Sequence, residues 1–137
     1  MGKSILSILA ALIGGTIITF LFEMIGNSIY PVPDGMDMTN PEVIKKYIQT
    51  APTGALIWVI LSWSIATFAA GFIASIIAGK SKLIHAIIVS IVLMMFGIIN
   101  MLMIPHPVWF WIAGILVYVP LGYLGGKLGA GLSSKKN

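Results

Sequence analysis

Residues 83–104 have the sequence LIHAIIVSIVLMMFGIINMLMI, which contains no Asp, Glu, Lys or Arg. A helix needs about 20 apolar residues to cross about 30 Å of bilayer hydrocarbon, so this stretch predicts a membrane span. Three other stretches are comparably long and apolar, although one contains Glu23 and another Lys127. The four predicted spans are residues 5–30, 53–79, 83–104 and 108–129.

The composition agrees with a protein that lies mostly within a bilayer. Hydrophobic residues make up 58% of the 137 positions and charged residues 9%, whereas soluble domains contain about 25% charged residues. This composition excludes a soluble globular domain. Short connections make consecutive spans antiparallel neighbours. Residues 1–137 are therefore expected to form one all-α membrane domain, an up-down bundle of four transmembrane helices.

The longest predicted connection, residues 31–52, contains a helix of a different kind. Thr39 and Glu42 have the spacing of a capping box, and the residues that follow form one apolar face. That face consists of Val43, Ile44, Tyr47 and Ile48. The pattern predicts a short amphipathic helix that lies on the outer surface or covers the mouth of the bundle.

The lysines predict the orientation of the spans, because cytoplasmic loops carry an excess of basic residues. With the N-terminus inside, six lysines lie on the cytoplasmic side: Lys3, Lys80, Lys82, Lys127, Lys135 and Lys136. Lys45 and Lys46 lie on the outer side, together with all four acidic residues. Both termini are therefore expected in the cytoplasm. The first apolar stretch is longer than the apolar core of a signal peptide, which favours a retained span.

Several kinds of site are excluded by residue types that the sequence lacks. Without cysteine there is no disulfide framework, Cys-based zinc site or catalytic thiol. All eight basic residues are lysines, which argues against bidentate clamping of phosphate by arginine. His85 and His106 are about 30 Å apart along a helix, so they cannot share a metal ion within one chain. We expect no catalytic constellation, no cofactor, no metal site and no nucleic-acid partner.

Two spans carry small residues at intervals of three or four positions, a spacing that lets transmembrane helices pack closely. On the second span these residues are Gly71, Ser75 and Gly79. On the fourth span they are Gly122, Gly125, Gly126 and Gly129. The spacing predicts close helix contacts but leaves open whether they lie within one chain or between copies, and we expect both.

Glu23 is the strongest candidate for a functional residue, because ionisable groups at membrane depth are costly and commonly functional. It shares a helix face with Asn27 and Tyr30. At 1.5 Å of rise per residue, Asn100 and Tyr118 lie at depths that bracket that of Glu23 on the third and fourth spans. These five residues are expected to form a polar site that opens outwards.

The surroundings of Glu23 leave its role open. The mouth of the site is expected to carry three residues from the outer connections: Asp34, Asp37 and His106. A protonated Glu23 could simply join helices through a hydrogen bond to Asn100 or Tyr118. It could instead bind an ion or proton, or act as a catalytic carboxyl.

Four segments contain most of the proline, glycine and aromatic residues near the span ends. They are Tyr30-Pro31-x-Pro33-x-Gly35-x-Asp37, Gly97-Ile98-Ile99-Asn100, Pro105-His106-Pro107-x-Trp109-Phe110 and Tyr118-x-Pro120-x-x-Tyr123-Leu124-Gly125-Gly126-Lys127-Leu128. Together they resemble a group of small bacterial four-span membrane proteins of unassigned function. The resemblance implies bacterial origin and residence in the inner membrane, and it carries no catalytic or binding residue over to this chain.

Three functions remain open on this basis. The small-residue faces favour the first, in which the chain acts through helix–helix assembly, as a homo-oligomer or an accessory subunit of a membrane complex. The second is a small oligomeric transporter or channel that uses Glu23 to bind a cation or proton. The third is an enzyme that modifies lipid in the outer leaflet, with Glu23 or His106 as acid or base. Because no nucleophile or metal ligand set accompanies them, we expect no enzyme.

Overall fold

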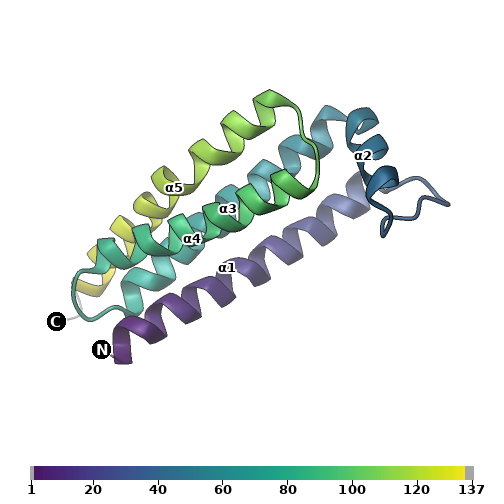
Figure 1. The fold of residues 1–137 in the computed structure, drawn as a ribbon. Helices are drawn as coiled ribbons and strands as arrows, with labels where there is room; N and C mark the ends of the chain where they lie inside the picture. Colours follow the sequence, from purple (N-terminus) through teal and green to yellow (C-terminus); the bar gives the residue numbers. More distant parts are fainter. Residues whose placement is uncertain (1, 135–137) are drawn as a thin grey trace.

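A computed structural model describes residues 2–134, which form five helices (Figure 1). The four long ones are α1 (Gly2–Ile29), α3 (Thr53–Ile77), α4 (Lys82–Met103) and α5 (Val108–Ser134). Each of these is long and apolar enough to cross a membrane. The short helix α2 (Pro41–Thr50) lies at one end of the bundle. The structure confirms the predicted all-α membrane protein with four spans and one short additional helix.

The two ends of the bundle carry different segments (Figure 1). At one end α1 begins and α5 ends, together with the turn at residues 78–81; we term this the terminal end. The opposite end, termed the loop end, carries residues 30–52 and the turn at 104–107. Four lysines lie towards the terminal end: Lys3, Lys80, Lys82 and Lys127. The other two that were assigned to this side, Lys135 and Lys136, lie outside the described residues.

Helix α3 is the centre of the bundle, because it packs against each of the other three long helices. Consecutive long helices are neighbours, as predicted, including α1 and α3, which the long segment of residues 30–52 connects. α1 and α5 lie on opposite sides of the α3–α4 pair, and their backbones do not come close to each other in the described chain. Since α1 packs mainly on α3 and much less on α4, only a small part of α1 is in contact with α4.

The small residues of α3 and α5 make contacts inside the chain. A Cβ atom added to Gly71 would overlap the carbonyl group of Gly122, and one added to Gly125 would overlap the carbonyl group of Phe68. The two backbones therefore touch, which is the arrangement that small residues permit between transmembrane helices. At this contact the predicted helix packing lies within one chain.

The same contact continues towards the terminal end. A Cβ atom on Gly129 would lie 2.6 Å from the carbonyl oxygen of Phe72, and Gly126 faces both α3 and α4. Ser75 is fully buried and donates a 3.0 Å hydrogen bond to the carbonyl oxygen of Lys82. Small residues thus bring three helices together at this end.

The prediction that Gly79 belongs to this packing face was wrong. α3 ends at Ile77, so Gly79 lies in the turn that leads to Ser81, whose backbone is left-handed with φ of 50°. A Cβ atom on Gly79 would meet only the side chain of Lys3, at 3.7 Å. The four-residue spacing of small residues continues beyond Ile77, where the helix stops. Helix α5, by contrast, is longer than the predicted span, because it continues to Ser134.

The start of α2 also differs from the predicted capping box. Asn40 is the N-cap, and its Oδ1 accepts a 3.0 Å hydrogen bond from the backbone N–H of Glu42. Pro41 takes the first helical position, where its lack of an N–H is harmless. Thr39 instead donates its N–H and its hydroxyl to the Asp37 carboxylate. These two hydrogen bonds hold the pKa of Asp37 below its usual value.

Candidate functional site

A half-open cavity of about 520 Å³ lies between α1 and α4, with α3 behind it. We term it the Glu23 cavity. All four long helices contribute to its lining. The residues discussed below are Thr16, Glu23, Trp63, Thr67, Asn100 and Tyr118. Three of the five predicted site residues therefore meet in one cavity: Glu23, Asn100 and Tyr118.

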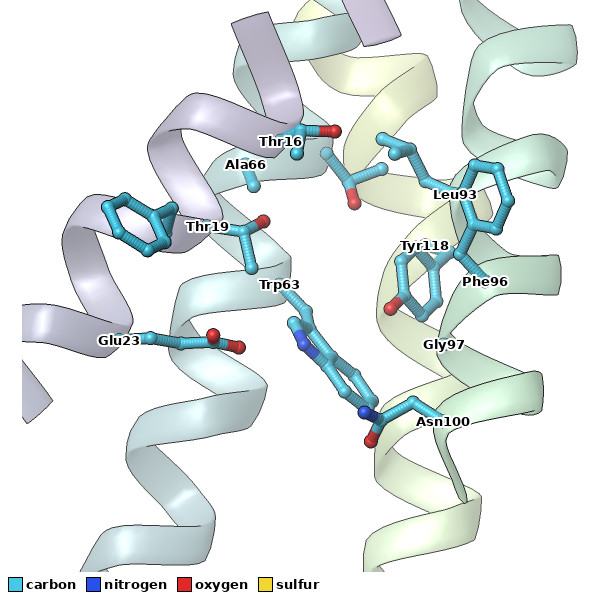
Figure 2. Close-up of a pocket in the computed structure, with 12 residues that line it drawn as sticks. Thr16, Thr19, Glu23, Trp63, Ala66, Leu93, Phe96, Gly97, Asn100 and Tyr118 are labelled. Carbon is cyan, nitrogen blue, oxygen red and sulfur yellow. The ribbon is translucent and has the colours of Figure 1, made fainter. Parts of the chain in front are cut away.

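Two polar side chains extend into this cavity from opposite sides (Figure 2). Glu23 extends from α1 towards Trp63, and Asn100 extends from α4 on the opposite side. Both side chains belong to exposed residues. The side-chain hydrogen bonds of the described chain involve neither of them, nor the Tyr118 hydroxyl. Of the three roles left open for Glu23, the helix-joining hydrogen bond to Asn100 or Tyr118 is therefore not present in the structure.

Hydrogen bonds between α1 and α3 fix the part of α1 that carries Glu23. The indole N–H of Trp58 donates a 2.7 Å hydrogen bond to the carbonyl oxygen of Phe22. One turn earlier, the Ser62 hydroxyl donates a 3.3 Å hydrogen bond to the carbonyl oxygen of Thr19. Because Glu23 follows Phe22 directly, these two bonds set the position and rotation of its helix face against α3.

The inner wall of the cavity is aromatic. Tyr118 is buried, and its ring lies 5.8 Å from the ring of Trp63, centroid to centroid. Trp63 in turn packs edge-on against Phe110, with centroids 5.5 Å apart. Gly97 of α4 leaves room for the Tyr118 hydroxyl, since a Cβ atom there would overlap it. This glycine therefore sets the position of the tyrosine.

Replacing Gly97 with alanine is expected to lower the stability of the bundle by about 1–3 kcal/mol, the usual cost of overpacking. The added methyl group would overlap the hydroxyl of Tyr118. The double variant G97A/Y118F lacks that hydroxyl but keeps the ring carbons Cζ and Cε2, which would lie 2.9 and 3.0 Å from the added Cβ atom, so it is expected to recover part of the loss. Thermal unfolding in detergent measures both. Equal instability of the single and double variants would contradict the packing of Tyr118 against Gly97.

The cavity reaches from the loop end into the middle of the bundle. At 1.5 Å per residue, Asn100 lies about 5 Å and Glu23 about 9 Å from the loop ends of their helices. Thr16 and Thr67 lie about 20 Å deep by the same rule. The Thr67 hydroxyl is buried and has no hydrogen-bond partner in the described chain. Since an unsatisfied buried hydroxyl costs about 1–3 kcal/mol, Thr67 lowers the stability of the bundle at this depth.

Glu23 also borders a second cavity, of about 330 Å³, which lies beneath α2. Asn27 and Tyr30, the other two predicted site residues, line this second cavity and are absent from the lining of the first. The structure thus divides the predicted site in two. Asn100 and Tyr118 lie on one side of Glu23, and the two α1 residues lie on the other.

The prediction for the mouth of the site was wrong. Asp34 and Asp37 are exposed in the connection between α1 and α2, which extends away from the bundle (Figure 1). His106 lines a separate pocket of about 430 Å³ beside the end of α2. None of the three lines the Glu23 cavity. The prediction failed because it used only depth, which does not determine the side of the bundle on which a connection lies.

His106 is held in a fixed orientation at the loop end. Its Nδ1 lies 2.6 Å from the carbonyl oxygen of Ile104, so this nitrogen carries the proton in the neutral ring. The ring is stacked on Phe110, with centroids 4.3 Å apart and an interplanar angle of 16°. Partial burial lowers the pKa of His106 and outweighs the hydrogen bond to Ile104, which acts in the opposite direction.

His106 is expected to titrate below 6.5, its ordinary pKa. Because the pKa is lower in the folded state, the unfolded chain binds a proton first as the pH falls. The contribution of His106 to stability is therefore greatest above its ordinary pKa and decreases on acidification through that range. An NMR titration of the imidazole measures the pKa directly. The stability of the H106Q variant is expected to lack this part of the pH dependence. An NMR titration midpoint of the His106 imidazole above 6.5 would contradict the prediction.

Sequence analysis missed Trp63 and Thr67 as cavity residues. The two lie four positions apart on α3 and therefore share a face. Thr67 continues the small-residue spacing of Gly71 and Ser75, which is a signal for an inward-facing hydroxyl. Trp63 lacks a comparable signal, because a tryptophan in a membrane span is equally compatible with contact to lipid.

Among residues 2–134, no group of three or more His, Cys, Asp or Glu side chains could hold a metal ion. No protein-family model, curated protein or solved structure matches the chain. The chemistry of the cavity itself is therefore the basis on which a function can be argued.

Proposed function

We propose that the protein is a small transporter or channel that binds a cation or proton at Glu23. The observation that carries this proposal is the exposure of Glu23 and Asn100 inside a cavity, about 5–10 Å below the loop end. Ionisable groups at membrane depth are costly and commonly serve an ion or a ligand. Since neither side chain bonds to another described residue, both can bind a ligand without first breaking a contact.

The position of Glu23 between two cavities supports movement of the bound species. One cavity lies beneath α2 at the loop end, and the other reaches about 20 Å into the bundle between α1 and α4. A ligand held by Glu23 can therefore approach from the loop end and leave into the deeper cavity. Because the Glu23 carboxylate borders both cavities, it is better placed to pass a bound ion from one cavity to the other than to serve a purely structural role.

We also propose the bacterial inner membrane as the location, with both termini in the cytoplasm. The four described lysines towards the terminal end, set against Lys45 and Lys46 at the loop end, favour this orientation. The acidic residues Asp34, Asp37 and Glu42 lie in the loop-end segment. The resemblance to small bacterial four-span proteins supports the choice of membrane. In this orientation the Glu23 cavity begins near the periplasmic surface.

Assembly, as a homo-oligomer or as an accessory subunit of a membrane complex, is the second candidate. The exposure of Glu23 and Asn100 also favours it, because a helix from another chain could cover both side chains. The small-residue faces do not distinguish the two functions, since Gly71, Gly122 and Gly125 are used within the chain.

Reconstitution of the purified protein into lipid vesicles distinguishes these functions. We expect such vesicles to dissipate an imposed proton or cation gradient faster than protein-free vesicles do. Native mass spectrometry of the same preparation, in mild detergent, counts the copies of the chain and detects other subunits. Flux from a preparation without other subunits supports transport. Absence of flux, together with a stably bound different subunit, would reject transport and support the accessory role.

A further inference from the structure

The charge that lines the Glu23 cavity is of one sign. Glu23 is the only acidic residue in its described lining, which contains no lysine or histidine. We propose that the ligand of this cavity is an amphiphilic organic ammonium ion, with its head at Glu23 and its apolar tail towards the bilayer. The inference rests on the proposed function, because it names the class of ligand for the same cavity.

The lining favours an organic cation over a metal ion. Trp63 and Tyr118 lie side by side on the wall behind Glu23, and aromatic rings attract ammonium groups within about 6 Å of the ring centroid. A hard metal cation such as Ca²⁺ needs at least about six oxygen ligands around one point. The polar side chains of this cavity are instead spread over about 15 Å of depth. The volume of about 520 Å³ is that of a pocket for a small organic molecule.

The opening of the cavity suits an apolar tail. Phe20 of α1 and Phe96 of α4 line it and are 62% and 60% exposed. These two helices make little contact with each other, so the cavity is open between them on the side that faces lipid. An alkyl chain can lie between the two phenylalanines and continue into the bilayer while its charged head remains at Glu23.

The same lining disfavours a phospholipid as the ligand. A phospholipid head group contains a negatively charged phosphate, and the described lining offers no cationic side chain to pair with it, while its one charged residue is the acidic Glu23. A single-chain amphiphile with one positive charge carries no phosphate and brings a charge opposite to that of Glu23.

Isothermal titration calorimetry on the purified full chain, in a nonionic detergent, tests this inference with hexyltrimethylammonium as the probe. Tetramethylammonium keeps the head and lacks the tail, and hexyl sulfate keeps the tail and reverses the charge. We expect hexyltrimethylammonium to bind at least about tenfold more tightly than either control. Glu23→Gln is expected to weaken this binding at least about tenfold, whereas Glu42→Gln on α2 leaves it unchanged.

A second variant keeps the test decisive if Glu23→Gln fails to fold. Phe96 is exposed, so Phe96→Ser leaves the packing of the bundle intact. It removes one side of the opening along which the tail would lie. We expect this variant to bind hexyltrimethylammonium severalfold more weakly than the wild type. Unchanged binding by Phe96→Ser would contradict the proposed position of the tail and overturn the inference.

Other outcomes separate this inference from the proposed function. Equal binding of hexyl sulfate, or a tightly bound phospholipid that hexyltrimethylammonium does not displace, would overturn the ligand class. Glu23-dependent flux of protons or metal ions, without binding of hexyltrimethylammonium, would also reject the ligand class but keep the transport function. Glu23-dependent binding without flux of any ion would reject transport and keep the ligand class.

Discussion

Replacing Glu23 with glutamine is expected to reduce cation or proton flux by about ten- to hundredfold. Glutamine keeps the shape of the side chain and removes its negative charge. An interaction with a charged group is worth about 1.5–3 kcal/mol, and each 1.4 kcal/mol corresponds to a factor of about ten in binding. Flux into vesicles that contain the variant, at the same amount of protein per lipid, measures the effect.

The matched control for this variant is Glu42→Gln. Glu42 is also a carboxylate of the loop-end half, but it is exposed on α2 and lines none of the cavities described above. Its substitution is expected to leave flux unchanged. Glu23→Gln should also fold normally, because the Glu23 carboxyl makes no hydrogen bond in the described chain, and such substitutions usually change stability by less than about 0.5 kcal/mol. Wild-type flux from a folded Glu23→Gln variant would exclude Glu23 as the binding group.

The spans could be predicted from the sequence because the bilayer imposes a simple requirement of length and polarity. All four predicted spans correspond to helices, and α4 matches its prediction within one residue at each end. The helix ends that lie at the terminal end of the bundle were less predictable. Ala78 and Gly79 are apolar or small and so extend the hydropathy signal past the last turn of α3, although they form a turn. Residues 130–134 continue α5 because no helix-breaking proline follows Gly129.

The candidate site was only partly predictable, because helical periodicity describes one helix at a time. Thr16, Thr19 and Glu23 lie on one face of α1, and all three line the same cavity, as their spacing indicates. The rotation of α3 against that face depends on contacts that no spacing specifies, such as the hydrogen bond from Trp58 to the backbone of α1. For this reason Trp63 is identified as part of the cavity only once the helices are packed.

The small-residue pattern shows that helical periodicity is limited in the same way when it is used to predict helix packing. The spacing of Gly71, Gly122 and Gly125 correctly predicted faces of close approach, since only small residues allow backbones to touch. It could not specify the partner, because an identical face serves equally for a helix of the same chain or of another. In this bundle the partner helix belongs to the same chain. A substitution at the contact between Gly125 and Phe68 tests this intramolecular packing.

Replacing Gly125 with leucine is expected to prevent α5 from packing on α3 and to abolish the folded bundle. The first atom of the new side chain would overlap the backbone carbonyl of Phe68, which cannot rotate away as a side chain can. Ordinary overpacking costs about 1–3 kcal/mol. A clash with backbone at the central helix should exceed this range and remove much of a total stability of about 5–15 kcal/mol.

The matched control is Gly131→Leu, on the same helix. A Cβ atom on Gly131 meets nothing within 4 Å, so this variant is expected to stay within about 0.5 kcal/mol of the wild type. Thermal unfolding and size-exclusion profiles in detergent compare the two variants. A folded, monodisperse Gly125→Leu protein would contradict the intramolecular contact. It would indicate that the face of α5 around Gly125 is free to meet another chain, and the balance between the two proposed functions would then shift from transport to assembly.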